Sequence, residues 1–230
     1  MIPCPFHQTA IMDTLINNHN AGRVAAIFDV DWTLVRGLTE RLFFRFLLRR
    51  RHLPLRQALP YLARLLVDPQ RRLRDKTYLR DFTLAEVAAW ARACFAADIL
   101  HKVSPVGLDC LEQHRRQGHA IVLVTGTLAV LAEPLQELVA ADWLIATHLA
   151  EAGGRLTGGL NGLNPRGEHK ATLMTALARE RGLDLTRSFS YGDSKEDVPI
   201  LKLVAHPVAV NPCRQLKEVA RRQGWPIYAF

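Results

Sequence analysis

A short apolar run at residues 24–28 ends on two carboxylates, Asp29 and Asp31. The β-rich composition of the run, which follows Gly22, predicts a buried strand. Residues two apart on an extended chain face the same way, so a tight turn at the end of this strand can aim both carboxylates at one ligand. Two negative charges this close repel, and each raises the pKa of the other unless a cation lies between them. The pair therefore indicates a metal ion, a shared proton, or both.

The second half of the chain alternates between strand and helix patterns. Residues 120–125 are an uninterrupted apolar, β-branched run, typical of a strand buried on both faces of a parallel sheet. A glycine-rich stretch at 151–163 predicts a hairpin. Repeated strand–helix units imply right-handed crossovers, so we expect an α/β fold with a three-layer, parallel, Rossmann-like sheet. The other predicted strands are 143–146, 188–191, 208–210 and 226–228, and the predicted helices are 105–117, 126–141 and 167–181.

Residues 36–103 have a different character, with almost no strand pattern. From residue 84 onward apolar residues recur at helical spacing, with Thr83 as the expected N-cap and Glu86 as its capping-box partner. We therefore predict an inserted all-α helical domain at 36–103. The α/β core is then made of residues 1–35 and 104–230.

The composition is that of an ordinary soluble globular protein, with 49% hydrophobic and 23% charged residues. The four cysteines are scattered and form no Cys-x-x-Cys pair, so they indicate neither a zinc site nor a disulfide framework. A reducing cytoplasm is the simplest compartment, and we expect neither a signal peptide nor a transmembrane segment. The longest uncharged apolar stretch, residues 120–132, is shorter than the ~18 residues that a membrane helix needs. For residues 1–21 we predict a short helix or a loose arm that carries no functional residue.

The net charge of +8 has two interpretations, which we weight evenly. A basic protein attracts phosphate-bearing partners, but it can also simply present a soluble basic surface. The arginine cluster of Arg41, Arg45 and residues 49–51 in the helical insertion is interpreted by default as a solvated face. An anionic membrane surface is an alternative that we do not favour, and we do not expect nucleic acid as a partner.

Polar residues follow three of the predicted strands, at the edge where an open α/β sheet binds its ligands. Taken singly, Thr125 is more often a helix N-cap and Lys170 a solvated surface lysine. A functional site is favoured because all of these residues occur in one order along the chain, each at a strand end or a helix start. The candidate residues are Asp29, Asp31, Thr125, Gly126, Lys170, Asp193 and Asp197.

This order resembles the four motifs of the haloacid dehalogenase (HAD) superfamily. Residues 29–33 are similar to its DxDxT motif, Thr125 to its hydroxyl motif, Lys170 to its basic motif and residues 192–197 to its GDSxxD motif. The details resemble the phosphoserine-phosphatase-like subfamily, which inserts a small helical cap after the first motif. The insertion at 36–103 falls at that point, so the resemblance implies a HAD-like core with a helical cap.

The resemblance also implies a mechanism. Asp29 would be the nucleophile that forms an aspartyl-phosphate, and Asp31 the general acid and then the general base. Mg²⁺ is the implied cofactor. The implied phosphoryl ligands are Thr125, Gly126 and Lys170, and the implied metal ligands are Asp29, Asp31 and Asp193, with Asp197 beside them.

The implied function is Mg²⁺-dependent hydrolysis of a small phosphorylated metabolite. Serine-specific members of the subfamily usually carry a Ser-Gly-Gly-Phe-like second motif, where this chain has residues 125–128 as Thr-Gly-Thr-Leu. They also carry an acidic residue early in the cap, near the position of Leu38. Phosphoserine phosphatase proper therefore remains an alternative to another small phosphomonoester hydrolase. A catalytically retired HAD-fold binding protein is the other alternative.

Three residues near the first motif are candidates for substrate contact. Arg36 and Glu40 are placed to reach from the insertion toward a substrate. Trp32 is the third candidate, although packing against the base of the insertion is its favoured interpretation because most tryptophans are largely buried.

Overall fold

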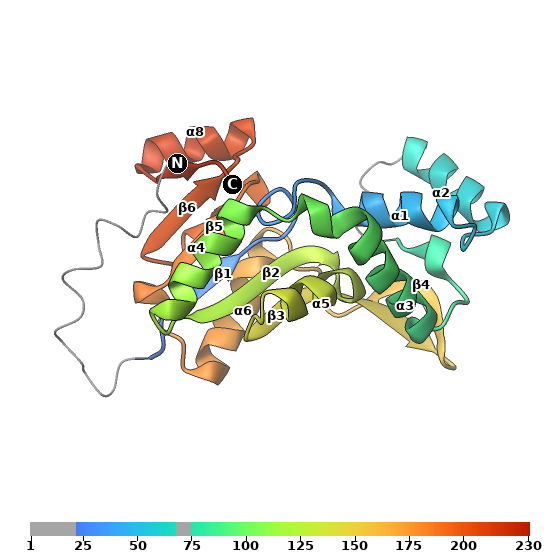
Figure 1. The fold of residues 1–230 in the computed structure, drawn as a ribbon, viewed down its shortest axis with the longest axis horizontal. Helices are drawn as coiled ribbons and strands as arrows, with labels where there is room; N and C mark the ends of the chain where they lie inside the picture. Colours follow the sequence, from blue (N-terminus) through green and yellow to red (C-terminus); the bar gives the residue numbers. More distant parts are fainter. Residues whose placement is uncertain (1–21, 68–74) are drawn as a thin grey trace.

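The computed structural model describes residues 22–67 and 75–230, so the arm predicted at 1–21 lies outside the described residues. At its centre is a seven-stranded sheet with the order β4-β3-β2-β1-β5-β6-β7 (Figure 1). Neighbouring strands are parallel except β3 and β4, which form an antiparallel hairpin. This confirms the predicted α/β fold. The strands are β1 (Ala25–Phe28), β2 (Ala120–Leu128), β3 (Trp143–Ala152), β4 (Arg155–Asn161), β5 (Phe189–Gly192), β6 (His206–Val210) and β7 (Ile227–Tyr228).

Helices accompany the strands and also fill the long connection after β1. None of the described helices is long and apolar enough to cross a bilayer. The α-helices are α1 (Thr39–Arg49), α2 (Leu55–Val67), α3 (Leu84–Cys94), α4 (Pro105–Arg116), α5 (Ala129–Leu138), α6 (Glu168–Arg181), α7 (Val198–Leu201) and α8 (Arg214–Gln223). Shorter turns are the 3-10 turns η4 (Thr77–Leu79), η6 (Leu100–Lys102), η7 (Leu185–Arg187) and η8 (Lys195–Asp197), and the π-helical turn η5 (Phe95–Ile99).

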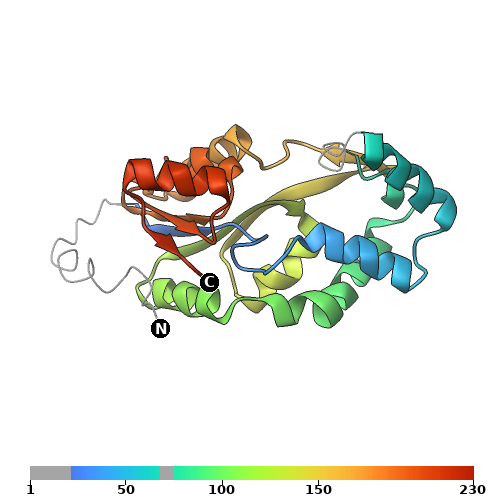
Figure 2. The ribbon, with the colours of Figure 1, turned by 90° about the horizontal axis from the view of Figure 1, so that it is seen from above.

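The sheet is covered on both faces, with α4 and α5 on one side and α6 and α8 on the other (Figure 2). Strand β1 shows why. Ala26 and Phe28 belong to the apolar cluster that includes α4 and α5, whereas Ala25 and Ile27 belong to the cluster that includes α6. Because side chains alternate along a strand, a strand whose four residues are all buried needs cover on both faces.

Three predicted boundaries near the polar edge of the sheet are wrong, the first being the end of β2, which lies at Leu128 rather than at residue 125. Helix α5 begins at Ala129 rather than at residue 126, because the chain stays extended through an irregularity in the β2–β3 register before Leu128 pairs with Thr147. Strand β3 does not end at residue 146 but continues to Ala152, where it becomes the first arm of the predicted hairpin. Helices α7 and α8 were not predicted.

The elements between residues 39 and 102, which we call the helical segment, leave and rejoin the core at one place. The Arg36 N–H donates to the Lys102 carbonyl at 2.9 Å, and the Ser104 N–H donates to the Leu34 carbonyl at 2.8 Å. The capping box predicted for α3 is present: Thr83 Oγ1 accepts from the Glu86 N–H at 3.2 Å, and the Thr83 N–H donates to Glu86 at 2.8 Å.

The β3–β4 hairpin extends beyond the rest of the sheet and contacts the helical segment (Figure 1). The Lys76 N–H donates to the Gly158 carbonyl at 2.8 Å. Leu156 exchanges main-chain hydrogen bonds with two residues of the segment, donating to Phe82 at 2.8 Å and accepting from Asp81 at 2.9 Å. The segment is therefore attached to the core through this hairpin as well as at its two ends, and α3 is also joined to α5 by the Arg92–Glu137 ion pair.

Substitutions of two hairpin glycines test this second attachment. Gly158 and Gly154 both have positive φ, at +80° and +73°, so alanine costs about 1 kcal/mol of backbone strain at either position. A Cβ at Gly158 would also lie 2.6 Å from Thr77 Cα, whereas one at Gly154 meets nothing within 4 Å. We expect Gly158→Ala to lower the free energy of unfolding in urea by a further ~1–3 kcal/mol relative to Gly154→Ala. Equal losses would contradict the close packing of the hairpin on the segment.

Candidate active site

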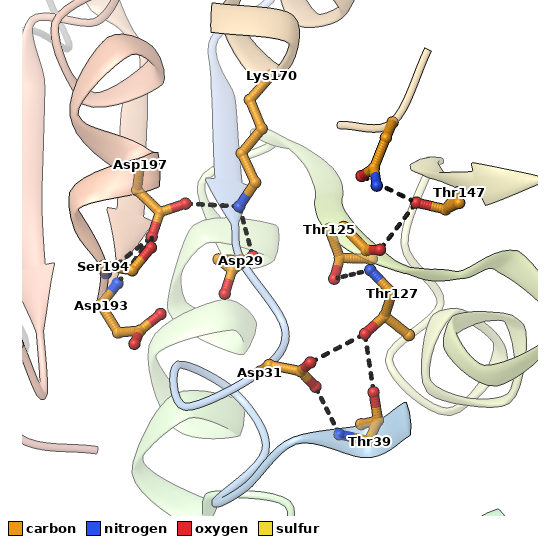
Figure 3. A network of polar contacts seen from close by, with 12 residues as sticks. Asp29, Asp31, Thr39, Thr125, Thr127, Thr147, Lys170, Asp193, Ser194 and Asp197 are labelled. Atoms are coloured by element: carbon orange, nitrogen blue, oxygen red, sulfur yellow. Dashed lines mark hydrogen bonds and ion pairs between the residues drawn. The ribbon is translucent and has the colours of Figure 1, made fainter. Parts of the chain in front are cut away.

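Side chains from the ends of β1, β2 and β5 and from the start of α6 surround a small cavity at the carboxyl edge of the sheet (Figure 3). Its volume is about 100 Å³. The cavity brings together every predicted site residue except Asp197, Arg36 and Glu40. It is lined by Asp29, Asp31, Trp32, Leu38, Thr125, Gly126, Thr127, Arg166, Lys170, Asp193, Ser194 and Glu196.

A buried lysine holds two of the carboxylates together. Lys170 Nζ donates to Asp29 Oδ1 at 2.6 Å and to Asp197 Oδ1 at 2.5 Å, and all three side chains are at most 10% exposed. Burial alone lowers the pKa of Lys170, but the two carboxylates outweigh it and raise that pKa above its ordinary value. Lys170 is therefore a fixed positive charge, and it connects the end of β1 to η8 (Figure 3).

Both carboxylate oxygens of Asp197 accept hydrogen bonds from the protein. Its Oδ1 accepts from Lys170, and its Oδ2 accepts from the N–H and hydroxyl of Ser194 at 2.9 and 2.8 Å and from the Asp193 N–H at 3.2 Å. These donors outweigh the effect of burial and lower the pKa of Asp197. Gly192 makes this packing close, because a Cβ there would lie 2.6 Å from Asp197 Cβ. Asp197 thus shapes the loop that presents Asp193.

Asp29, Asp193 and Asp197 form a carboxylate cluster in which one oxygen atom of each lies within 4.8 Å of the other two. Burial raises the pKa of Asp29 to about 7 against the pull of Lys170, with the neighbouring Asp197 and Asp31 adding to the rise. Burial and the charges of Asp29 and Asp197 raise the pKa of Asp193 to about 8. One lysine cannot neutralise three carboxylates. An all-oxygen donor set with excess negative charge fits a hard divalent cation such as Mg²⁺.

Asp31 has a different environment. Its Oδ1 accepts from the Thr39 N–H at 3.0 Å and its Oδ2 from the Thr127 hydroxyl at 2.9 Å, while the Thr39 and Thr127 hydroxyls lie 2.9 Å apart. Burial raises the pKa of Asp31, although the hydrogen bonds from Thr39 and Thr127 oppose the rise. Because Thr39 is the first residue of α1, this network ties Asp31 to the start of the helical segment (Figure 3).

The turn at the end of β2 is held by its own hydrogen bonds. Thr125 Oγ1 accepts from the Thr127 N–H at 3.1 Å, and the Thr147 hydroxyl donates to the Gly126 carbonyl at 2.8 Å. Thr125 is buried and still lines the cavity. Because α5 begins only at Ala129, Gly126 belongs to this irregular strand end and not to the first turn of the helix.

The three candidates for substrate contact have different positions. Trp32 is 50% exposed and lines the cavity, so its predicted packing against the base of the insertion is wrong. A positive φ of 63° holds it in this position, and the Asn211 side chain donates to its carbonyl at 3.0 Å. Arg36 is exposed and does not line the cavity. Glu40 is paired with the buried Lys76 at 2.6 Å.

Sequence reasoning missed the roles of Thr39 and Thr127 around Asp31, and it missed Arg166 altogether. Arg166 lines the cavity and packs on Gly126 so closely that a Cβ there would lie 2.8 Å from Arg166 Nε. Its Nε is buried and has no hydrogen-bond partner among the described residues. Nothing in the local pattern distinguishes this arginine from the many others in the chain.

Comparisons with known proteins agree with this geometry. The family model described as haloacid dehalogenase-like hydrolase matches residues 26–202. The chain is 32% identical to the inhibition of morphological differentiation protein of Streptomyces azureus, over 94% of this chain and 81% of that protein. It is 29% identical to a histidinol-phosphatase of Neisseria meningitidis serogroup C (strain 8013), over 89% and 98% of the two chains. It is 30% identical to phosphoserine phosphatase SerB1 of Mycobacterium tuberculosis (strain H37Rv), over 90% and 70%.

Solved structures show the same fold. A Bordetella pertussis Tohama I protein of unknown function superposes with a TM-score of 0.80 at 27% identity, over 90% of this chain and 99% of that one. A phosphoserine phosphatase in its apo form superposes with a TM-score of 0.64 at 18% identity, over 90% and 93%. The chain therefore belongs to the haloacid dehalogenase-like hydrolase family and is a phosphatase of that family.

Proposed function

We propose that the chain hydrolyses a small phosphomonoester with Mg²⁺ as cofactor and with Asp29 as the residue that becomes phosphorylated. The observation that carries this proposal is the position of Lys170, which bonds both Asp29 and Asp197 beside the carboxyl group of Asp193. A carboxylate and the phosphate dianion that it attacks repel each other, so the reaction needs positive charge beside both groups. Here the chain supplies one fixed cation and the oxygen ligands for a second.

The proposed metal ligands are the Asp29 and Asp193 carboxylates and the Asp31 backbone carbonyl. Bound Mg²⁺ would supply charge neutralisation and orientation of the phosphoryl group. Asp197 already accepts from Lys170, Ser194 and Asp193, so we assign it the positioning of Lys170 and of the metal-binding loop.

Asp31 is the proposed general acid for the leaving alcohol, and then the base for the attacking water. Burial raises its pKa, which makes the protonated form more accessible than in an exposed aspartate. The Thr127 hydroxyl and the Thr39 N–H hold the carboxyl group, so the proton would sit at a defined atom. Asp29, by contrast, is kept ready to ionise by Lys170. Two neighbouring carboxyl groups can thus take opposite roles.

We assign the phosphoryl oxygens to Thr125, Gly126 and Lys170, and we add Arg166 to this group. Its guanidinium is packed against the turn that carries the Thr125 hydroxyl, and its Nε lacks a partner among the described residues. A guanidinium binds phosphate through a planar fork of donors, which makes it suited to this position.

Residues 36–103 are proposed to act as a cap that selects the substrate and excludes water. Leu38 lines the cavity from the cap side, and Trp32 lines it from the adjacent turn of the core. Glu40 is already neutralised by Lys76, so it offers no free carboxylate for the ammonium of an amino-acid substrate. This pairing favours another small phosphomonoester over phosphoserine, which remains the second candidate because the chain resembles a phosphoserine phosphatase. The cytoplasm remains the proposed compartment.

Replacing the proposed nucleophile tests the chemistry and the alternative of a retired binding protein. Asp29→Asn should reduce Mg²⁺-dependent turnover of an aryl phosphate by at least about 10³-fold, because an amide cannot carry the phosphoryl group. The matched control is Glu196→Gln, which removes a carboxylate that lines the same cavity and should retain most of the activity. A wild-type protein without turnover, or an Asp29→Asn variant as active as wild type, would contradict the proposal.

The raised pKa values predict how Mg²⁺ stabilises the protein at different pH. Asp29 and Asp193 have folded pKa values of about 7 and 8 against an ordinary value of 3.8, so the folded protein binds more protons than the unfolded chain in this window. Without metal, these groups make the protein less stable as the pH rises from about 4 to about 8. Mg²⁺ competes with the same protons. We expect the rise in Tm with Mg²⁺ to be larger at about pH 8 than at about pH 5.5, and to be mostly lost in Asp193→Asn.

An equal Mg²⁺ shift at both pH values would contradict this assignment of the ligands, and so would an undiminished shift in Asp193→Asn.

Arg166 provides a test of the phosphoryl-binding group. Arg166→Gln should raise KM for a phosphomonoester by about tenfold, because a charge-assisted pair of hydrogen bonds is lost. Arg166→Lys keeps the charge but not the fork of donors, so it should recover part of that loss. The control is Arg179→Gln on the exposed part of α6. An unchanged KM in Arg166→Gln would exclude the residue from substrate binding.

A further inference from the structure

Helix α2 presents an apolar face to solvent. Leu55, Leu59, Leu62 and Leu66 recur at intervals of four, three and four residues, which places them on one side of a helix. Their exposed fractions are 68%, 61%, 38% and 86%. Single exposed leucines are ordinary, but a continuous apolar stripe on a surface marks a site of interaction.

The stripe is not the face that holds α2 on the protein. That face carries Ala58 and Tyr61, which are buried in the main apolar cluster. The Tyr61 ring packs against Phe44 and Tyr78, with ring centroids 5.5 and 4.7 Å apart. Much of the leucine surface therefore lies outside this contact, and burying it against a partner would be favourable.

The sequence that carries the stripe is strongly basic. Residues 41–67 contain seven arginines and no aspartate or glutamate. The arginines are exposed, at Arg41, Arg45, Arg49, Arg50, Arg51, Arg56 and Arg64. Arg56 follows Leu55 directly, so at about 100° per residue it lies at the border of the stripe. Both views place α1 and α2 together at the end of the molecule opposite to α8 (Figures 1 and 2).

A second cavity lies in this charged region. It has a volume of about 210 Å³ and is lined by Arg45, Arg49, His101, Lys102, Leu42 and Asp98. Asp98 is paired with Arg49 at 2.6 Å, so the lining carries net positive charge. The cavity lies between α1 and the end of the helical segment, and its chemistry fits an anionic group such as a phosphate.

Charge and apolar area together decide what covers the surface. A second copy of the chain would bring arginines against arginines, and nucleic acid would leave the leucines in water. An anionic bilayer satisfies both features, because basic side chains bind its headgroups while leucines enter the boundary with the acyl chains.

We propose that α2 and the surrounding arginines dock the helical segment on an anionic lipid bilayer, with the α2 leucines inserted at the interface. The proposal is independent of the proposed reaction. It replaces the solvated face expected from the sequence, because the exposure of the leucines is known only from the fold. The docking surface continues into α1, whose first residue, Thr39, bonds to Asp31.

Liposome flotation of the full chain tests this proposal. The probes are vesicles of phosphatidylcholine alone and vesicles with about 30% phosphatidylglycerol. We expect binding to the anionic vesicles only, weakened by salt. Leu59→Ser/Leu66→Ser should reduce the partition coefficient by at least about tenfold, because the apolar contribution is lost. Arg45→Gln/Arg56→Gln should reduce it as well, since each basic residue near the surface contributes to binding.

Matched controls separate the proposed surface from general effects. Leu138→Ser removes an exposed leucine of α5, and Arg221→Gln/Arg222→Gln removes two exposed arginines of α8. Both should bind vesicles nearly as well as wild type. Aryl phosphatase activity and circular dichroism establish that the α2 variants are folded, and loss of that activity in all variants would concern the proposed function and not the docking surface.

Three outcomes would overturn the proposal. The first is no binding of wild type to anionic vesicles at low salt. The second is equal binding by the leucine variant, which would place the contact elsewhere. The third is a concentration-dependent dimer that the leucine variant abolishes, with no vesicle binding, which would assign the stripe to a second copy of the chain.

Discussion

A single buried ammonium group determines how the site is arranged. Lys170 reaches from the start of α6 to the end of β1 and to η8, and it meets a carboxylate at each. Burying Lys170 with Asp29 and Asp197 costs several kcal/mol per charge unless each charge is paired. The pairing therefore fixes the relative positions of elements that are far apart in the sequence. It leaves a local excess of negative charge, which is the physical reason that the same cluster suits a divalent cation.

The two aspartates of the first motif illustrate how one strand end supports different protonation behaviour. Asp29 faces a permanent positive charge, whereas Asp31 faces hydroxyl and amide donors that carry no charge. Burial raises both pKa values, and the rise is opposed by an ionic partner at Asp29 and by uncharged donors at Asp31. The difference arises because β1 ends between two layers, with α6 on one side and the start of α1 near the other.

The strands and the main site residues could be predicted because they depend on local patterns. A strand buried on both faces is continuously apolar, and polar residues at its end are conspicuous in the sequence. The contacts of Thr39, Thr127 and Arg166 could not be predicted, because each depends on a partner brought close only by the fold. The predicted packing of Trp32 is wrong for a related reason. Its exposure follows from a left-handed backbone conformation at a turn, which the amino-acid composition does not reveal. The same limit applies to α2, where a helical pattern does not say which of its apolar faces is covered.

The attachment of the helical segment through the β3–β4 hairpin has a mechanical consequence. A domain attached at a single hinge can rotate about it, whereas a domain attached at more than one place can move only if the structure between the attachments deforms. Here the intervening structure is the β3–β4 hairpin: β3 pairs with β2 in the sheet, and β4 carries the bonds with Lys76, Asp81 and Phe82. Any movement of the segment away from the cavity must therefore deform this hairpin or break those main-chain bonds. The twist of the β3–β4 hairpin and the position of the helical segment are therefore mechanically coupled.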